Sequence, residues 1–334
     1  RAGMPPSLPQ PHRERKIAVY RDLGAMTLKS GAPLRCGVVI GPDPEWHDRL
    51  VPFLGHKRPE TREQIRRSLA ESLDDLETRY YVGCVEDRLI TQVMIAVSRR
   101  VGILGHVYTL PECRRQGACV ALFERMMDDV RARGDRVLVL STGYDTPPYW
   151  IYHRFGFRSI APGRGQMKWL ASPDAETDLF APATTTPRRL HWGDWPWVDR
   201  LGMQLPTPDE DRPRSALWRL RDFGSLETPF SVFQAHRTEA THATAFVAAG
   251  GSTVGWAILA PDPTWFGDAL LLDFYLHPHF VAQAESLLTE LLRPAERPVV
   301  AITGEPAGWK RRLLGALGFR AQARIATWQL WQRA

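Results

Sequence analysis

The chain has 334 residues, of which 44% are hydrophobic and 24% are charged, and it carries a net charge of +6. This composition is typical of a globular protein, and the length suits two domains of about 150 residues each. No apolar run reaches the roughly 18 residues of a membrane-spanning helix, so we expect no membrane partner. The basic residues form no run of five, so we expect no nucleic-acid partner.

The cysteines and the start of the chain indicate a reducing location. None of the four cysteines has the CxxC spacing, and no secretory signal precedes them, so we expect free thiols in the cytoplasm. Residues 1–3 look like a remnant before Met4, and the Pro- and charge-rich stretch that follows predicts an N-terminal arm over residues 1–30. The cysteines are Cys36, Cys84, Cys113 and Cys119.

The first half of the chain alternates β-prone runs with helical patterns. Apolar runs bounded by turn residues predict strands, and amphipathic stretches with capping residues predict helices. In chain order we expect a strand over 35–40, a helix from the capping box at Thr61 to about residue 76, a hairpin over 80–85 and 89–97, a strand over 103–110, a helix from Gly117 to Gly134, a strand over 137–140 and a short helix over 149–155.

A polar stretch rich in Pro and Thr separates this half from a second one that repeats it. We expect a first domain over 31–172, a linker over 173–187 and a second domain over 188–334. A strand that ends at Pro278 matches the one that ends at Pro111, 167 residues earlier. The Gly-Phe pair at Gly318 likewise matches that at Gly156, 162 residues earlier, so one fold is used twice.

The junction between the strand over 103–110 and the helix after it predicts a phosphate-binding turn. The sequence there reads Arg-Arg-Gln-Gly-Ala-Cys over residues 114–119. Glycine lets the backbone approach a ligand closely, and the unpaired N–H groups of the first helical turn point at it together with the positive end of the helix dipole. A phosphate-rich ligand is therefore expected at this turn.

Together with the stretch Tyr152-x-x-x-Gly156-Phe157, this junction resembles the GCN5-related N-acetyltransferase (GNAT) family. The resemblance implies an α+β fold: a mixed, mostly antiparallel sheet flanked by helices, with splayed fourth and fifth strands, here in two tandem copies. It implies acetyl-CoA as the acyl donor and an amine acceptor that is a small molecule or a peptide. We expect no metal, because His277 and His279 have no third ligand nearby in the sequence. The residues implied to bind the cofactor are Val107, Tyr108, Thr109, Arg114, Arg115, Gln116, Gly117, Ala118 and Cys119, where Cys119 replaces the usual Gly or Ala.

The resemblance implies one residue as the catalytic acid and leaves several candidates for the base. Tyr152 inherits the role of the general acid that protonates the departing thiolate, because a phenol and a thiol have similar pKa values. His106 is the candidate base, and strand alternation should place it on the same face as Tyr108. The other base candidates are Ser141, Tyr144, Asp145 and His153, and Tyr144, Asp145 and Tyr149 are candidate substrate contacts.

The second half lacks both landmarks. No Arg-x-x-Gly follows Pro278, and Leu314 stands where the first half has Tyr152, so we expect a degenerate GNAT domain without catalysis. The function predicted for the chain is N-acetyl transfer from acetyl-CoA to a primary amine, by a monomer or a homodimer. Two alternatives stay open: a non-catalytic acyl-CoA sensor or scaffold, and the same fold acting on a hydroxyl or with a longer acyl group.

Overall fold

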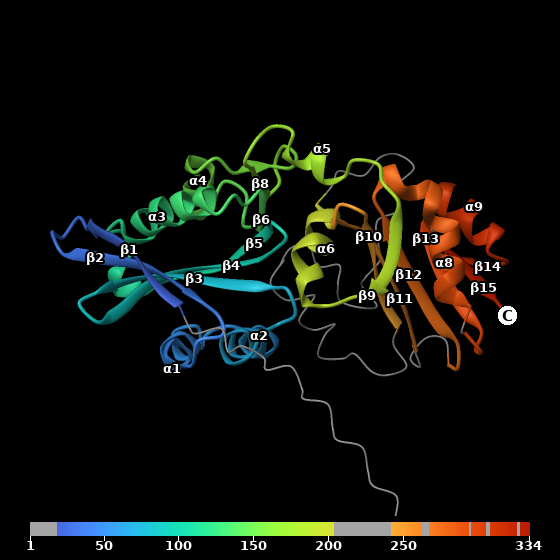
Figure 1. The fold of residues 1–334 in the computed structure, drawn as a ribbon, viewed down its shortest axis with the longest axis horizontal. Helices are drawn as coiled ribbons and strands as arrows, with labels where there is room; N and C mark the ends of the chain where they lie inside the picture. Colours follow the sequence, from blue (N-terminus) through green and yellow to red (C-terminus); the bar gives the residue numbers. More distant parts are fainter. Residues whose placement is uncertain (1–18, 204–241, 262–266, 294, 305–307, 326–327) are drawn as a thin grey trace, which may run out of the picture.

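The computed structural model describes residues 19–203, 242–261, 267–293, 295–304, 308–325 and 328–334. In these ranges the chain forms two mixed β-sheets, one of eight strands and one of seven, each flanked by helices (Figure 1). The α+β fold class predicted from the sequence is confirmed. No helix in the described ranges has the length and apolar character needed to cross a membrane.

The first sheet has the order β1-β2-β3-β4-β5-β6-β8-β7, and only β5 and β6 run parallel to each other. The long apolar runs that predicted the hairpin are buried throughout in β4, because helices cover both faces of the sheet (Figure 1). The strands are β1 (Val19–Thr27), β2 (Pro33–Ile40), β3 (Glu77–Val85), β4 (Arg88–Ser98), β5 (Val101–Thr109), β6 (Val137–Ser141), β7 (Arg158–Ser159) and β8 (Gln166–Leu170).

Two helices lie on each face of this sheet. On one face lie α1 (Pro44–Phe53) and α2 (Pro59–Ala70), and on the other lie α3 (Ala118–Ala132) and α4 (Pro147–Arg154) (Figure 1). The expected capping box at Thr61 is wrong, because α2 begins at Pro59 and Thr61 is buried inside the helix. Proline can replace a cap at the first helical turn, where its missing N–H would have no helical partner.

The prediction of an N-terminal arm over 1–30 is wrong for Val19–Thr27. These residues form β1, which pairs antiparallel with β2 along the edge of the first sheet. The strand escaped notice because most of its side chains are exposed, so it has no alternating apolar pattern. Residues 1–18 of the expected arm lie outside the described ranges.

The second sheet repeats the topology of the first. Its order is β14-β15-β13-β12-β11-β10-β9, and only β12 and β13 are parallel, so β9 to β15 correspond in order to β2 to β8. The strands are β9 (Thr185–Arg189), β10 (His242–Ala248), β11 (Thr253–Pro261), β12 (Leu270–Leu276), β13 (Val299–Gly304), β14 (Arg320–Ile325) and β15 (Trp328–Arg333), and the helices are α6 (Trp195–Gly202), α8 (Ala284–Leu292) and α9 (Gly308–Ala316).

The segment expected as a linker over 173–187 is partly ordered structure. It contains the short helix α5 (Ala175–Leu179) and the first residues of β9. Glu176 of α5 pairs with Lys168 of β8 at 3.0 Å and with the buried Arg200 of α6 at 2.5 Å. Its carboxylate therefore lies between one cation from the first sheet and one from the second half.

Helix α6 packs against both sheets. It follows β9 in the chain, yet it contacts β4, β5 and β6 of the first sheet as well as β11 of the second. Trp197 is 1% exposed and donates its Nε1–H to the carbonyl oxygen of Ser98 at 3.1 Å. One continuous apolar core runs from the α1 and α2 face of the first sheet into the second half.

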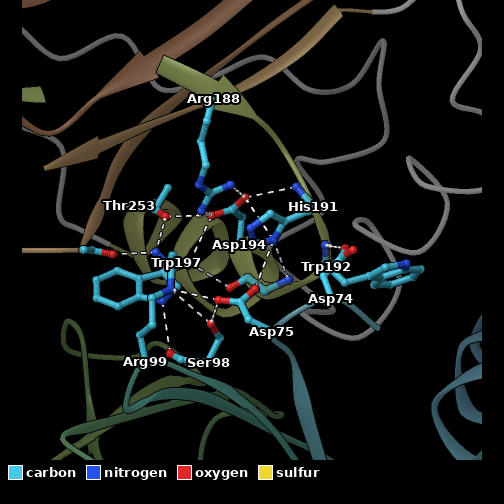
Figure 2. A network of polar contacts seen from close by, with 12 residues as sticks. Asp74, Asp75, Ser98, Arg99, Arg188, His191, Trp192, Asp194, Trp197 and Thr253 are labelled. Carbon is cyan, nitrogen blue, oxygen red and sulfur yellow. Dashed lines mark hydrogen bonds and ion pairs between the residues drawn. The ribbon is translucent and has the colours of Figure 1, made fainter. Parts of the chain in front are cut away.

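A polar network joins the two halves beside α6 (Figure 2). Arg99, in the turn between β4 and β5, pairs with Asp194 at 3.1 Å, and Arg188 of β9 pairs with the same carboxylate at 2.7 Å. Burial raises the pKa of Asp194, but hydrogen bonds from Arg188 and Thr253, the nearby guanidinium charge and the His191 N–H outweigh it and lower the pKa overall. Asp194 is therefore a buried, ionised link between the sheets.

Candidate active site

Strands β5 and β6 separate after a short parallel stretch. They pair only from Val101 with Val137 to Ile103 with Val139, although β5 continues to Thr109 and β6 to Ser141. The splay predicted between the fourth and fifth strands of the fold is thus present. The last residues of β5, including Val107, Tyr108 and Thr109, are half-buried and lie beyond the last β5–β6 pair.

The turn over residues 114–117 lies directly in front of α3, where the sequence predicts a phosphate-binding cradle. Arg115 and Gly117 both adopt left-handed backbone conformations, with φ of +63° and +89°. A Cβ on Gly117 would meet nothing within 4 Å, so glycine is required here by the left-handed backbone conformation and not by lack of space. The space at this end of the helix is therefore open. The helical ladder starts with Ala121 N–H donating to Gly117 O at 2.9 Å, so the N–H groups before Ala121 point out of the helix.

The side chains around this turn suit an anionic ligand. Arg114 and Arg115 are exposed, and Arg114 donates its Nε–H to the carbonyl oxygen of Thr109 at 3.1 Å, with its guanidinium 6.0 Å from the ring of Tyr108. Burial raises the pKa of the Cys119 thiol to about 11. Cys119 is therefore neutral at physiological pH and adds no negative charge at the cradle.

The carbonyl oxygen of Gln116 ties the cradle to another part of the first sheet. It accepts a hydrogen bond at 3.0 Å from the N–H of Lys29, in the turn between β1 and β2. The β1 strand that the sequence did not predict therefore helps to hold the turn before α3. Ala118, the first residue of α3, is 2% exposed and packs in the core under the turn.

Tyr152 lies on α4, next to α3. It is 7% exposed, and its ring packs 5.5 Å from that of Phe123 on α3 and 6.2 Å from that of Phe157. Its carbonyl accepts the N–H of Phe157 at 3.2 Å, and Gly156, with φ of +95°, donates to His153 O at 3.2 Å. This pair of bonds is a Schellman motif, which explains why Gly and Phe follow the tyrosine at a fixed spacing.

His106 sits in a β-bulge that the sequence did not predict. Gln92 pairs with Tyr108 and Met94 with Gly105, so His106 and Val107 together oppose one residue of β4. His106 has φ of +52°, a conformation that costs about 1–3 kcal/mol in a residue other than glycine. It is fully buried, so it is poorly placed to exchange protons with solvent as a base.

The expected strand alternation around His106 is confirmed despite the bulge. His106 faces α2, with its Nε2 3.4 Å from Gln64 Oε1, and Tyr108 lies on the same face. Val107 packs on the opposite side, in the core under α3. The splayed end of β5 therefore presents Tyr108 toward α1 and α2, and Val107 toward the cradle helix.

His56, in the connection between α1 and α2, is a candidate that the sequence reasoning missed. Its ring lies 4.2 Å from that of Tyr108, and its side chain is exposed. Partial burial, Lys57 and His106 lower its pKa, so it is neutral at physiological pH and able to accept a proton. It lies about 50 residues before Tyr108 in the sequence, and no motif spacing connects the two.

The loop before α4 and the start of that helix carry the candidate substrate residues. Tyr149 is buried and contacts Ser159 through its hydroxyl at 2.9 Å, so it belongs to the core. Tyr144 is 52% exposed and lies edge-on to Tyr149, and Asp145 accepts the Nε1–H of the exposed Trp150 at 2.8 Å. Of the two tyrosines predicted to contact substrate, only Tyr144 is exposed, and Trp150 is exposed beside it.

In the second half, other residues of the chain occupy the positions that correspond to the cradle and to Tyr152. Helix α9 ends in the same Schellman motif, with Phe319 N–H donating to Leu314 O at 2.9 Å, and the buried Leu314 replaces Tyr152. In place of the cradle, the 3₁₀-helix η3 (Pro278–Gln283) leads directly into α8. Gln283 binds Ala183 O and Thr185 N–H, at 2.8 and 2.9 Å, so the linker occupies this end of α8.

Comparison with known proteins identifies the class of this fold. Residues 81–169 match the family model of FR47-like proteins, which are related to the GNAT acetyltransferases. The resemblance to GNAT proteins expected from the sequence is confirmed, and the matched range contains β5, the cradle, α3 and Tyr152. A search of curated proteins gave no match.

Solved structures of GNAT proteins resemble one half of the chain. The GNAT domain of PAT from S. lividans is 14% identical, with a TM-score of 0.35, and the match covers 44% of this chain and 96% of that one. The ribosomal-protein-S18-alanine N-acetyltransferase from Escherichia coli is 16% identical, with a TM-score of 0.33 and coverages of 40% and 94%. Spermidine N-acetyltransferase from Vibrio cholerae, in complex with CoA and spermine, is 11% identical, with a TM-score of 0.34 and coverages of 44% and 92%.

Proposed function

We propose that the chain is an acyl-CoA-dependent N-acyltransferase that transfers an acetyl group from acetyl-CoA to a primary amine. The observation that carries this proposal is the contrast between the two halves. The first half has a left-handed turn at Gly117 in front of α3 and Tyr152 on the neighbouring helix. The second half repeats the strands and the Schellman motif without either feature, so the cradle and the tyrosine are not requirements of the fold itself.

In this proposal the cradle residues 114–119 hold the pyrophosphate of the cofactor, and the exposed guanidinium groups of Arg114 and Arg115 add charge attraction. The pantetheine arm lies along the splayed end of β5, where the strand backbone continues beyond its last pair with β6. The acyl carbonyl then lies near the bulge, and the N–H of Val107 or Tyr108 stabilises the developing oxyanion.

The amine attacks from the side of α1 and α2. Its nitrogen forms a bond to the thioester carbon, the C–S bond breaks, and Tyr152 gives its hydroxyl proton to the thiolate. The Tyr152 phenolate then regains a proton from solvent. The proton lost by the amine passes to solvent, directly or through His56, whose lowered pKa keeps it neutral beside Tyr108. We prefer His56 to His106 as the base because His106 is fully buried.

The second half serves as a non-catalytic partner domain in this proposal. Its strand β12 is bound by Lys310, whose Nζ–H donates to Phe274 O at 2.7 Å, and its η3 region is bound by the linker. Phe274 corresponds to Val107 when the two prolines are aligned. In the second half, residues of the chain itself therefore bind both positions that correspond to the proposed cofactor site of the first half.

The test measures both binding and turnover. Calorimetry with CoA and thiol release from acetyl-CoA, across a panel of amines, should show binding and amine-dependent turnover by the native chain. Tyr152→Phe should keep the affinity for CoA and lower kcat by about 100-fold or more, because only proton donation is removed. Binding without turnover on any amine or hydroxyl acceptor, with any acyl-CoA, would instead support the alternative of an acyl-CoA sensor.

A further inference from the structure

We propose that Gln92 and Gln64 are positioning residues that hold the β5 bulge in the shape needed for acyl transfer. This inference rests on the function proposed above and assigns two side chains to its oxyanion site. Neither glutamine lies in the cradle or near Tyr152 in sequence, and both are buried, at 0% and 1% exposure. Their amide groups meet at the backbone and the ring of His106.

The contacts reach His106 from two separate elements. Gln92, on the neighbouring strand β4, donates its Nε2–H to the carbonyl oxygen of His106. Gln64, on α2, places its Oε1 3.4 Å from His106 Nε2. One amide thus holds the backbone at the left-handed residue, and the other meets its ring, so the bulge is fixed from the sheet and from the helix layer.

The second half provides an internal comparison for this assignment. Gln92 lies opposite Tyr108, and the corresponding pair in the second sheet is Trp256 opposite Tyr275. Trp256 has no amide that could bind a strand carbonyl in the same way. The β11–β12 pairing is regular over its whole length, and among the described residues β12 contains no left-handed position. The glutamine and the bulge occur together in β4 and β5, and the described residues of the corresponding strands β11 and β12 have neither.

The bulge matters for chemistry because it changes which N–H groups face the splay. In a regular ladder every second N–H of β5 would be directed at β4. With His106 and Val107 opposite a single residue, one extra backbone group is released from that ladder. If the bulge relaxes, the N–H of Val107 turns away from the acyl carbonyl, while the cradle at 114–119 is unchanged.

The experiment compares Gln92→Leu, Gln92→Met and Gln64→Leu with the native chain. Gln92→Met keeps a similar side-chain length and removes the donor, so it remains informative if the leucine variant fails to fold. The matched control is Gln283→Leu, which removes an amide that binds backbone in the second half. Three quantities are measured: the backbone amide signals of residues 105–108 by NMR, the affinity for CoA, and kcat for amine-dependent release of CoA.

We expect both Gln92 variants and Gln64→Leu to shift the amide signals of His106 and Val107 and to lower kcat, by about 100-fold for the Gln92 variants, as for loss of one oxyanion donor. The affinity for CoA should stay at the native value, and Gln283→Leu should change neither kcat nor these signals. Unchanged amide signals, or a shifted bulge with native kcat, would overturn the proposal. If the native chain turns over no acyl-CoA, the proposed function fails, while the amide signals still decide whether Gln92 holds the bulge.

Discussion

Lys310 of α9 donates its Nζ–H to the carbonyl oxygen of Phe274 at 2.7 Å, at the position on β12 that corresponds to Val107 on β5. The lysine is 3% exposed, and its ammonium group also lies 4.7 Å from the ring of Phe274. A buried cation with these partners is costly to displace, so a ligand cannot easily take its place along β12. The two sheets share a topology, but they differ in what binds this strand edge.

The first prediction is that one CoA molecule binds per chain. Among the described residues before α8 there is no left-handed turn like that at Gly117, and Lys310 and the linker bind the positions that a cofactor would need. Isothermal titration of the native chain with CoA should give a stoichiometry of one. Lys310→Met should lower the stability and keep that stoichiometry, and two binding events in either protein would contradict the assignment.

The second prediction concerns the left-handed turn. Gly117→Ala should weaken CoA binding by about 10-fold, because a residue with a Cβ pays about 1–2 kcal/mol for φ of +89° and shifts the turn to avoid it. The control is Gly318→Ala, where φ is +83° and the added Cβ also meets nothing within 4 Å. It should cost similar stability and leave CoA affinity unchanged; equal losses of affinity in both variants would exclude a specific role for Gly117.

The third prediction is a change in the pH profile when His56 is replaced. Its pKa is lowered from the ordinary value by partial burial, then by Lys57 and His106, so the neutral form dominates above pH 6.5. Activity that uses this base should fall as pH drops below that value. His56→Gln should lower kcat/KM at neutral pH and remove this acidic limb from a plot of kcat/KM against pH. An identical profile in the variant would leave proton removal to solvent.

The fourth prediction is a loss of stability in mild acid through His277. Burial, then His279 and Arg200, lower its pKa to about 3, and its ring stacks on Phe180 at 4.4 Å. Between that value and the ordinary pKa near 6.5, the unfolded chain binds a proton that the folded chain does not. The free energy of unfolding should therefore fall as pH drops from 6.5 toward 3. Denaturation curves of His277→Phe should show a smaller fall, and an equal slope would contradict this origin.

The fifth prediction is that the two sheets unfold together. Trp197→Ala removes a buried ring of α6 that donates to Ser98 of the first sheet, and such changes cost about 3–5 kcal/mol. Hydrogen exchange should show reduced protection in both sheets. Trp150→Ala, at a residue 54% exposed, should change stability little. Loss of protection confined to the second sheet would show that the halves are independent.

Local patterns in the sequence predicted much of the fold and pointed to the residues of the proposed site. Three features depend on the conformation of only a few neighbouring residues, and the sequence therefore predicts them. They are the apolar runs of β3 and β4, the glycine before α3 and the Tyr-x-x-x-Gly-Phe motif. The Schellman motif is the clearest case, since Gly156 is needed for its left-handed conformation and recurs at Gly318. Duplication also showed in the sequence, because both halves keep the same turn residues.

The features that the sequence did not predict depend on contacts between segments that are far apart in the chain. Nothing near His106 marks the bulge, because the amides that hold it come from Gln92 and Gln64, 14 and 42 residues away. His56 reaches Tyr108 only after α1 and α2 pack on the sheet. Strand β1 lies on an edge with few buried side chains, so it lacks the apolar alternation by which strands are recognised.

Helix α6 has a consequence for how the protein is made. It completes the core beneath β4, β5 and β6, yet it is encoded after the first strand of the second sheet. During synthesis the first sheet must therefore stay without its full covering until the ribosome has moved well into the second half. A gene split at the linker would separate the proposed catalytic half from the helix that covers part of its sheet.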